Sequence, residues 1–137
     1  MIEAAEENGV YLMTAFRLHY EPGTVEALER IRQGQIGEAR IFNSILSFRI
    51  QSENHRLKSS LWGGPLQDLG AYCINAARHI FEAEPTEVWT SCNERTDNPL
   101  FNEVAETIAV TMVFPRGRIA QFIVSFGADT CDSYTVV

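Results

Sequence analysis

Four side chains that can exchange protons or hold hydroxyl groups recur at helical spacing in the middle of the sequence. Asp68, Tyr72, Asn75 and His79 stand at i, i+4, i+7 and i+11, so an α-helix would place them on one stripe. An acid, a phenol and an amide on one face suit proton transfer to or from a bound molecule. The alternative is a solvated helix face, which more often carries Lys and Glu.

The residues around this stripe predict a helix that is packed on its other side. Gly63 and Gly64 precede the helix and would let the backbone approach a ligand closely. Cys73 lies among apolar positions and is predicted as a small core residue. His79, near the helix end, is interpreted as a charge that interacts with the last backbone carbonyls rather than as a catalytic base.

The composition is that of a single globular domain and argues against several classes of partner. The chain has 137 residues, 45% of them hydrophobic, and a net charge of −7 with no block of basic residues. Nucleic acid and anionic membrane surfaces are therefore not expected as partners. No apolar run is long enough to predict a membrane span, and the acidic start lacks the pattern of a signal peptide, which predicts a cytoplasmic protein.

The cysteines predict neither disulfides nor a metal site. Cys73, Cys92 and Cys131 make an odd number and form no Cys-x-x-Cys pair. A zinc site built from Cys92, His55 and His79 is conceivable, but no two of these ligands share a helical turn. We therefore expect free thiols and no bound metal.

The hydrophobic patterns predict an α+β fold with an open, largely antiparallel β-sheet and helices on one face. Helices are expected up to Asn8-Gly9, from Pro22 to Gly34, and after Gly64. Strands are expected at residues 10–13, 36–50, 88–92, 106–114, 118–127 and 133–137, with a hairpin turn at residues 115–117 and a polar loop at residues 51–61.

Two further features concern the sheet and the chain ends. Ala120, Phe122, Val124 and Phe126 share one face of a strand and predict contact with the core, whereas the opposite, mixed face is predicted to be either solvated or a partner surface. The chain begins within a helix and ends in an apolar strand at residues 134–137. Because an unprotected apolar edge invites pairing, we interpret the sequence as truncated at both ends.

Five segments, taken in order, resemble the glucose-fructose oxidoreductase/inositol dehydrogenase family, also called Gfo/Idh/MocA. They are Ala15-Phe16-Arg17-Leu18-His19-Tyr20-Glu21-Pro22, Ile31-Arg32-Gln33-Gly34-Gln35-Ile36-Gly37, His55-Arg56-Leu57, the helix after Gly63-Gly64, and Glu84-Pro85-Thr86-Glu87-Val88. Each is a weak signal alone, but their order and spacing are specific.

The resemblance implies a piece of a two-domain, Rossmann-type dehydrogenase that uses NADP or NAD. Residues 1–14 would be the tail of the N-terminal Rossmann domain, and residues 15–137 the C-terminal α+β substrate and oligomerisation domain. No Gly-x-Gly-x-x-Gly occurs in the chain, so the cofactor would be bound mainly by the domain outside it. The family's Glu-Lys-Pro is also absent, and Lys58 does not match its lysine.

The resemblance also implies roles for the stripe residues. Tyr72 would transfer the proton, Asp68 would orient it or the sugar hydroxyls, and Asn75 would hold a hydroxyl. Trp62 stands where relatives often have glycine, and would fill the pocket mouth or stack on a sugar. Without the resemblance, the favoured interpretation of Tyr72 is a half-buried aromatic residue whose hydroxyl lies at the helix surface.

Two arginines match family positions near the cofactor or the substrate rim. Arg17 follows Phe16, and Arg56 follows His55, in segments that carry the resemblance. The alternative for both is a surface salt bridge.

These features predict the catalytic C-terminal part of an NAD(P)-dependent oxidoreductase that acts on a sugar or cyclic polyol, with the fragment alone inactive. A homo-oligomer through the open sheet face is expected. The alternatives are a noncatalytic sugar-binding protein or an oligomerisation module that keeps the fold.

Overall fold

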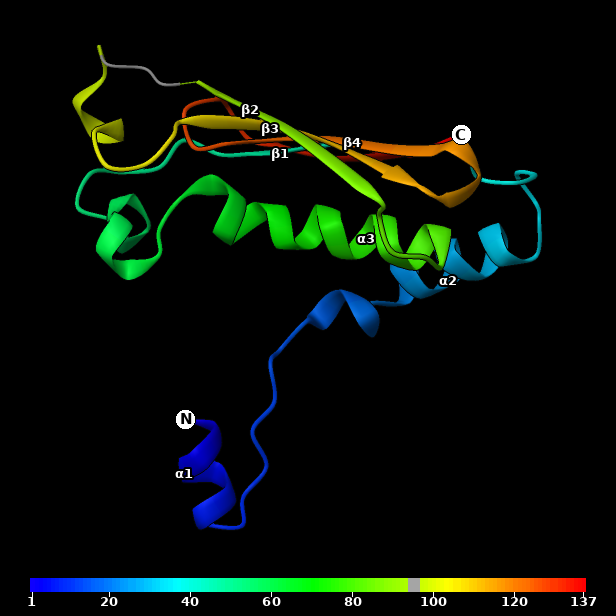
Figure 1. Ribbon diagram of the computed structural model, residues 1–137, viewed down its shortest axis with the longest axis horizontal. Coiled ribbons are helices and arrows are strands. Elements are labelled where there is room, and N and C mark those ends of the chain that lie inside the picture. The colour runs from blue at the N-terminus through cyan, green and yellow to red at the C-terminus, as the bar shows by residue number, and fades with distance from the viewer. Residues whose placement is uncertain (94–96) are drawn as a thin grey trace.

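A five-stranded sheet carries helices on one of its faces, as Figure 1 shows. The computed structural model describes residues 1–93 and 97–137. The helices are α1 (Ile2–Glu7), α2 (Pro22–Arg32) and α3 (Ala71–Phe81), and the strands are β1 (Ile41–Ser47), β2 (Glu87–Asn93), β3 (Thr107–Phe114), β4 (Arg118–Ser125) and β5 (Cys131–Val136). Short helical turns lie at Arg17–His19 (η1), His55–Leu57, Ser59–Leu61, Leu66–Gly70, Pro99–Phe101 and Pro115–Gly117.

The sheet is open and mostly antiparallel, as the sequence predicts. Its strand order is β2-β3-β4-β1-β5, and the only parallel pair among the described strands is β1 with β4. The predicted hairpin turn at Pro115–Gly117 joins β3 to β4 and places Arg116 at a φ of 67°. The fold class is therefore confirmed.

The core lies between the sheet and α3. Phe42 of β1 and Phe122 and Val124 of β4 are at most 1% exposed, and they face Cys73 and Ala77 of α3, which are fully buried. This burial arises because side chains in a strand point alternately to its two faces, and one face of β1 and β4 packs against the apolar side of α3. The predictions for Cys73 and for the apolar face of β4 are confirmed.

Local sequence fixes the start of α2. Glu21 is the N-cap, and its carboxylate accepts hydrogen bonds from the backbone amides of Gly23 and Thr24 at 3.0 and 2.6 Å. Pro22 stands in the first turn, where its missing amide proton costs nothing. The turn η1 is thereby held directly before a well-defined helix.

Two strand predictions differ from the structure. The expected buried strand at residues 10–13 is wrong, because this segment pairs with no described strand and Tyr11 and Met13 are exposed. The strand expected from residue 36 begins only at Ile41, since Gly34 and Gly37 adopt left-handed φ angles of 73° and 78° and form a turn.

The helix α1 lies apart from the sheet and its two covering helices (Figure 1). None of its residues is buried, and an extended segment connects it to η1. Its end near Gly9 agrees with the sequence. No helix in the described part of the chain is both long and apolar enough to cross a membrane.

Candidate functional site

The two glycines before α3 are required by the chain's own backbone. The Gly63 amide donates to the Lys58 carbonyl at 2.9 Å, and the Gly64 amide donates to the Arg56 carbonyl at 2.9 Å. A Cβ atom on Gly63 would lie 2.3 Å from the Arg56 carbonyl oxygen. The close approach expected for a ligand is therefore occupied here by residues 56–58.

Asp68 and Arg56 form an ion pair at the start of the helical segment. Arg56 Nε lies 2.8 Å from Asp68 Oδ1, and the two side chains are 39% and 27% exposed. Leu66–Gly70 is a π-helical turn, which winds more slowly than the α-helix assumed in the stripe. Asp68 borders neither of the cavities that meet at Tyr72.

Tyr72 lies in the wall between two unlike cavities. The first has a volume of about 320 Å³, lies between η1, α2 and α3, and is also lined by Asn75 and His79. The second, of about 360 Å³, is lined by Arg17 of η1 and Asp132 of β5 as well as Tyr72. The walls of both cavities are mostly apolar, and the polar share is larger in the second.

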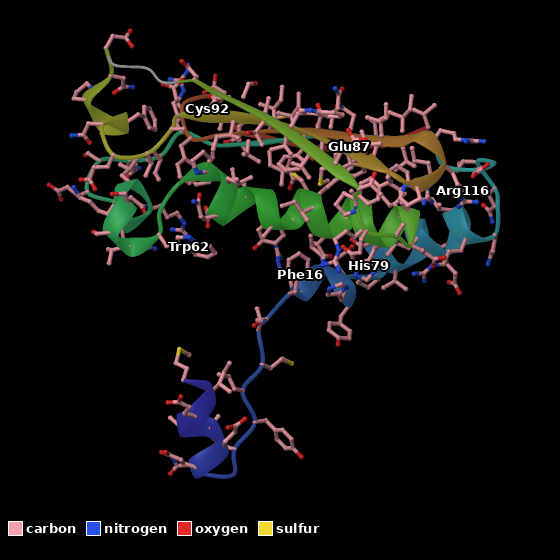
Figure 2. All side chains as sticks on the ribbon, in the orientation of Figure 1. Phe16, Trp62, His79, Glu87, Cys92 and Arg116 are labelled. Atoms are coloured by element: carbon pink, nitrogen blue, oxygen red, sulfur yellow. The ribbon has the colours of Figure 1, made fainter. Side chains whose placement is uncertain are left out.

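A row of rings connects η1 to α3 beside the first cavity. Ring centroids are 5.2 Å apart for Phe16 and Tyr72, 5.0 Å for Phe16 and His19, and 4.6 Å for His19 and His79. Figure 2 shows the labelled Phe16 and His79 in the layer between α3 and the turn below it. These contacts fix the turn against the helix that bears Tyr72.

His79 does not act as the helix-end charge that the sequence suggested. Burial, followed by the nearby charge of His19, lowers the pKa of His79 from its ordinary value of 6.5. Its ring packs edge-on against the ring of His19. The neutral imidazole is therefore the form that this environment favours.

The sequence analysis missed the contacts made by Phe16 and His19. The two residues are three apart, and one 3₁₀ turn places such residues on the same side. That spacing was the available signal, but the partner helix could not be inferred from it. The ring row depends on how α3 packs against η1.

Trp62 stands apart from the other candidate residues. Its side chain is 79% exposed, its φ is 57°, and it ends the Ser59–Leu61 turn. Figure 2 shows it toward the opposite end of the helical segment from His79. The structure thus groups Tyr72 with Asn75 and Arg17, pairs Asp68 with Arg56, and leaves Trp62 separate.

The cysteines are unpaired, as the sequence analysis predicted. Cys73, Cys92 and Cys131 are free thiols. Across residues 1–93 and 97–137, no three His, Cys, Asp or Glu side chains gather closely enough to hold a metal ion. The cavities at Tyr72 are lined by an amide, imidazoles, a guanidinium and the carboxylates of Glu21 and Asp132.

Comparison with known families decides how the fold is classified. Residues 24–137 match the model of the GFO/IDH/MocA C-terminal domain. The chain belongs to the GFO/IDH/MocA family. The match covers the sheet and α3 with Tyr72, whereas η1, which lines part of both cavities, lies before it.

Individual relatives of the GFO/IDH/MocA chain are oxidoreductases. An oxidoreductase of Rhizobium meliloti, ORF334, is 31% identical over 91% of this chain and 36% of its own length. The D-xylose 1-dehydrogenase [NADP(+)] of Haloarcula marismortui is 33% identical over 64% of this chain and 26% of its own length.

A solved structure agrees with this classification. The aldose-aldose oxidoreductase of Caulobacter crescentus, crystallised with glycerol, superposes with a TM-score of 0.88 at 31% identity. It covers 98% of this chain, and the match covers 41% of that protein. The GFO/IDH/MocA chain therefore spans less than half the length of these relatives.

Proposed function

We propose that this chain is the substrate-binding and catalytic C-terminal part of an NAD(P)-dependent oxidoreductase that oxidises a hydroxyl group of a sugar or cyclic polyol. The observation that carries the proposal is the position of Tyr72, whose phenol can transfer a proton and which borders two cavities, one shared with Asn75 and the other with Arg17. The similarity to a D-xylose dehydrogenase and an aldose-aldose oxidoreductase supports a sugar as the substrate class.

Tyr72 and Asn75 would handle the reacting hydroxyl. Oxidation of a secondary alcohol removes a proton from oxygen and a hydride from carbon. Tyr72 would accept the proton, and Asn75, on the same cavity, would hold a hydroxyl through its amide. A phenol is a weak base at neutral pH unless a cation lies close to it, and Arg17 borders the second cavity with Tyr72.

Asp68, Arg56 and Trp62 would act at the rim. Asp68 holds the Nε atom of Arg56, so the other guanidinium donors of Arg56 are available to a cofactor phosphate or a substrate hydroxyl. The exposed ring of Trp62 would stack on a sugar face. In this proposal Asp68 positions Arg56 instead of touching Tyr72.

The residues present do not form a dinucleotide site by themselves. The chain contains no Gly-x-Gly-x-x-Gly, and no described strand passes through a glycine-rich turn into a helix. NADP or NAD would therefore be bound mainly by a Rossmann domain joined to this chain, with residues 1–14 as its tail. When bound, the nicotinamide supplies hydride acceptance.

The sheet face opposite the helices would pair with a second copy. One row across the sheet, in registered order, contains Trp89, Thr111, Gln121, Asn43 and Thr135, and the neighbouring row contains Ser91, Ala109, Ile123, Ile45 and Ser133. Neither row carries a charge. Sedimentation of the chain should show association that Ile123→Asp weakens, and a strict monomer at high concentration would contradict this pairing.

The catalytic proposal is tested with the full-length protein in which this chain follows a Rossmann domain. Reduction of NADP or NAD is measured with a panel of aldoses, ketoses and inositols. Turnover of any member supports the oxidoreductase. Binding of a sugar without turnover by either cofactor would favour the noncatalytic sugar-binding alternative.

A further inference from the structure

Two imidazole rings from different elements are packed directly against each other. His19 in η1 and His79 in α3 have ring centroids 4.6 Å apart at an interplanar angle of 66°. Edge-to-face packing at this distance is favourable between neutral rings. It leaves no room for a carboxylate or a water between the two rings if both become charged.

The charged groups around the pair do not offset a second positive charge. Arg32 of α2 and Arg78 of α3 both disfavour protonation of His79, whereas Glu82 favours it. Glu82 is itself paired with Arg32 at 2.9 Å, and Arg78 is paired with Glu84.

The other acidic group near the His19–His79 pair is Glu21, the N-cap of α2. Glu21 borders the same cavity, but its carboxylate oxygens accept hydrogen bonds from the Gly23 and Thr24 amides and from the Thr24 hydroxyl. Of the groups on η1, α2 and α3, none places an uncommitted carboxylate against the two rings.

We propose that His19 and His79 form a pH-sensitive latch, which holds η1 against α3 while both rings are neutral and releases it when both are protonated. The latch belongs to this chain and does not depend on the proposed enzymatic activity. Its output is the position of Phe16, because Phe16 lies between His19 and Tyr72 in the ring row.

The direction of the pH dependence follows from the docked state, in which η1 is held against α3. The pKa of His79 is lowered from 6.5 in the folded chain, mainly by burial and then by His19. A histidine with a lowered pKa stabilises the docked state above its ordinary pKa, and this contribution is lost as the pH falls below about 6.5. Acidification therefore opens the contact, and neutral pH closes it.

Nuclear Overhauser contacts between the Phe16 and Tyr72 rings test the latch in the 137-residue chain. We expect these contacts at pH 7.5 and a loss of roughly half or more of their intensity at pH 5.0, because the two charged rings repel. Contacts between the core rings of Phe81 and Phe114, whose centroids lie 4.9 Å apart, should persist at both values.

Matched variants distinguish the effect of the His19–His79 pair from the effects of other titrating groups. His19→Phe and, independently, His79→Phe keep a ring in place without a titratable nitrogen, so each should retain the Phe16–Tyr72 contacts at pH 5.0. His55→Gln, in the separate His55–Leu57 turn, should behave like the original chain. Equal contacts at both pH values, the same loss in both Phe variants, or simultaneous loss of the core contacts would each overturn the proposal.

Discussion

Asp68 forms an ion pair with Arg56 and not a contact with Tyr72, although Asp68 and Tyr72 are only four positions apart in the sequence. The carboxylate oxygen Oδ1 lies 2.8 Å from Arg56 Nε, while Tyr72 packs its ring against Phe16 at 5.2 Å. Tyr72 borders both cavities, whereas Asp68 borders neither. The acid and the phenol therefore serve different parts of the proposed site.

The Asp68–Arg56 pair should contribute little to folding. Both side chains keep contact with solvent, so Asp68→Asn is expected to change the free energy of unfolding by less than about 1 kcal/mol in urea denaturation. Glu26→Gln, which removes the exposed partner of Arg30, is the matched control. A loss above about 2 kcal/mol for Asp68→Asn alone would show that the pair is structural.

Gly63→Ala should destabilise the chain through contact with the backbone. The added Cβ would meet the Arg56 carbonyl oxygen at 2.3 Å and the Lys58 carbonyl oxygen at 2.8 Å, so we expect a loss of about 1–3 kcal/mol. Gly34→Ala is the control, because it meets no atom within 4 Å and carries only the cost of its φ of 73°. An equal or smaller loss for Gly63→Ala would argue against this packing.

Cys73 should resist alkylation at pH 8. Burial raises the pKa of its thiol to about 11, so only about one molecule in a thousand carries the thiolate. Cys92 is exposed and serves as the internal control. Mass spectrometry after brief iodoacetamide treatment should find label on Cys92 and none on Cys73 until denaturant is added. Equal labelling in the native chain would contradict the buried position.

Arg118→Met should be among the substitutions in the sheet that lower the free energy of unfolding most. Arg118 is 5% exposed, donates to the carbonyls of Phe81 and Pro115 at 2.7 and 2.9 Å, and lies over the Phe81 ring. Its loss leaves the Phe81 carbonyl at the end of α3 without its hydrogen-bond donor. We therefore expect the free energy of unfolding, measured in denaturant, to fall by about 2–4 kcal/mol. Arg49→Met, which removes an exposed pair with Asp129, should cost about 0.5 kcal/mol or less. Similar costs for both would refute the capping role.

The sequence predicted the sheet better than the segments around it, for physical reasons. In β4 the alternation of Ala120, Phe122 and Val124 determines which face is buried, because side chains in a strand have a period of two. The apolar residues 10–13 carry a comparable local signal, but a strand also needs a neighbour for its hydrogen bonds. That partner is a tertiary feature and is not contained in the local pattern.

In the candidate site, too, the local pattern predicts some positions, and others depend on tertiary contacts. Tyr72 and Asn75 border one cavity because both lie on the regular helix or at its start, where the assumed spacing applies. Asp68 departs because its carboxylate pairs with Arg56, a contact that helical spacing does not contain. The His19–His79 contact joins two elements 60 positions apart, which a periodicity within one helix cannot predict.

The most direct test of the account is the turnover number of the Tyr72→Phe variant in the full-length protein that contains this chain. If Tyr72 transfers the proton, kcat should fall by roughly two to four orders of magnitude while cofactor affinity changes little. Tyr20→Phe, at a largely exposed position that lines neither cavity, should keep normal turnover. Turnover close to that of the unmodified enzyme in Tyr72→Phe would contradict the central claim.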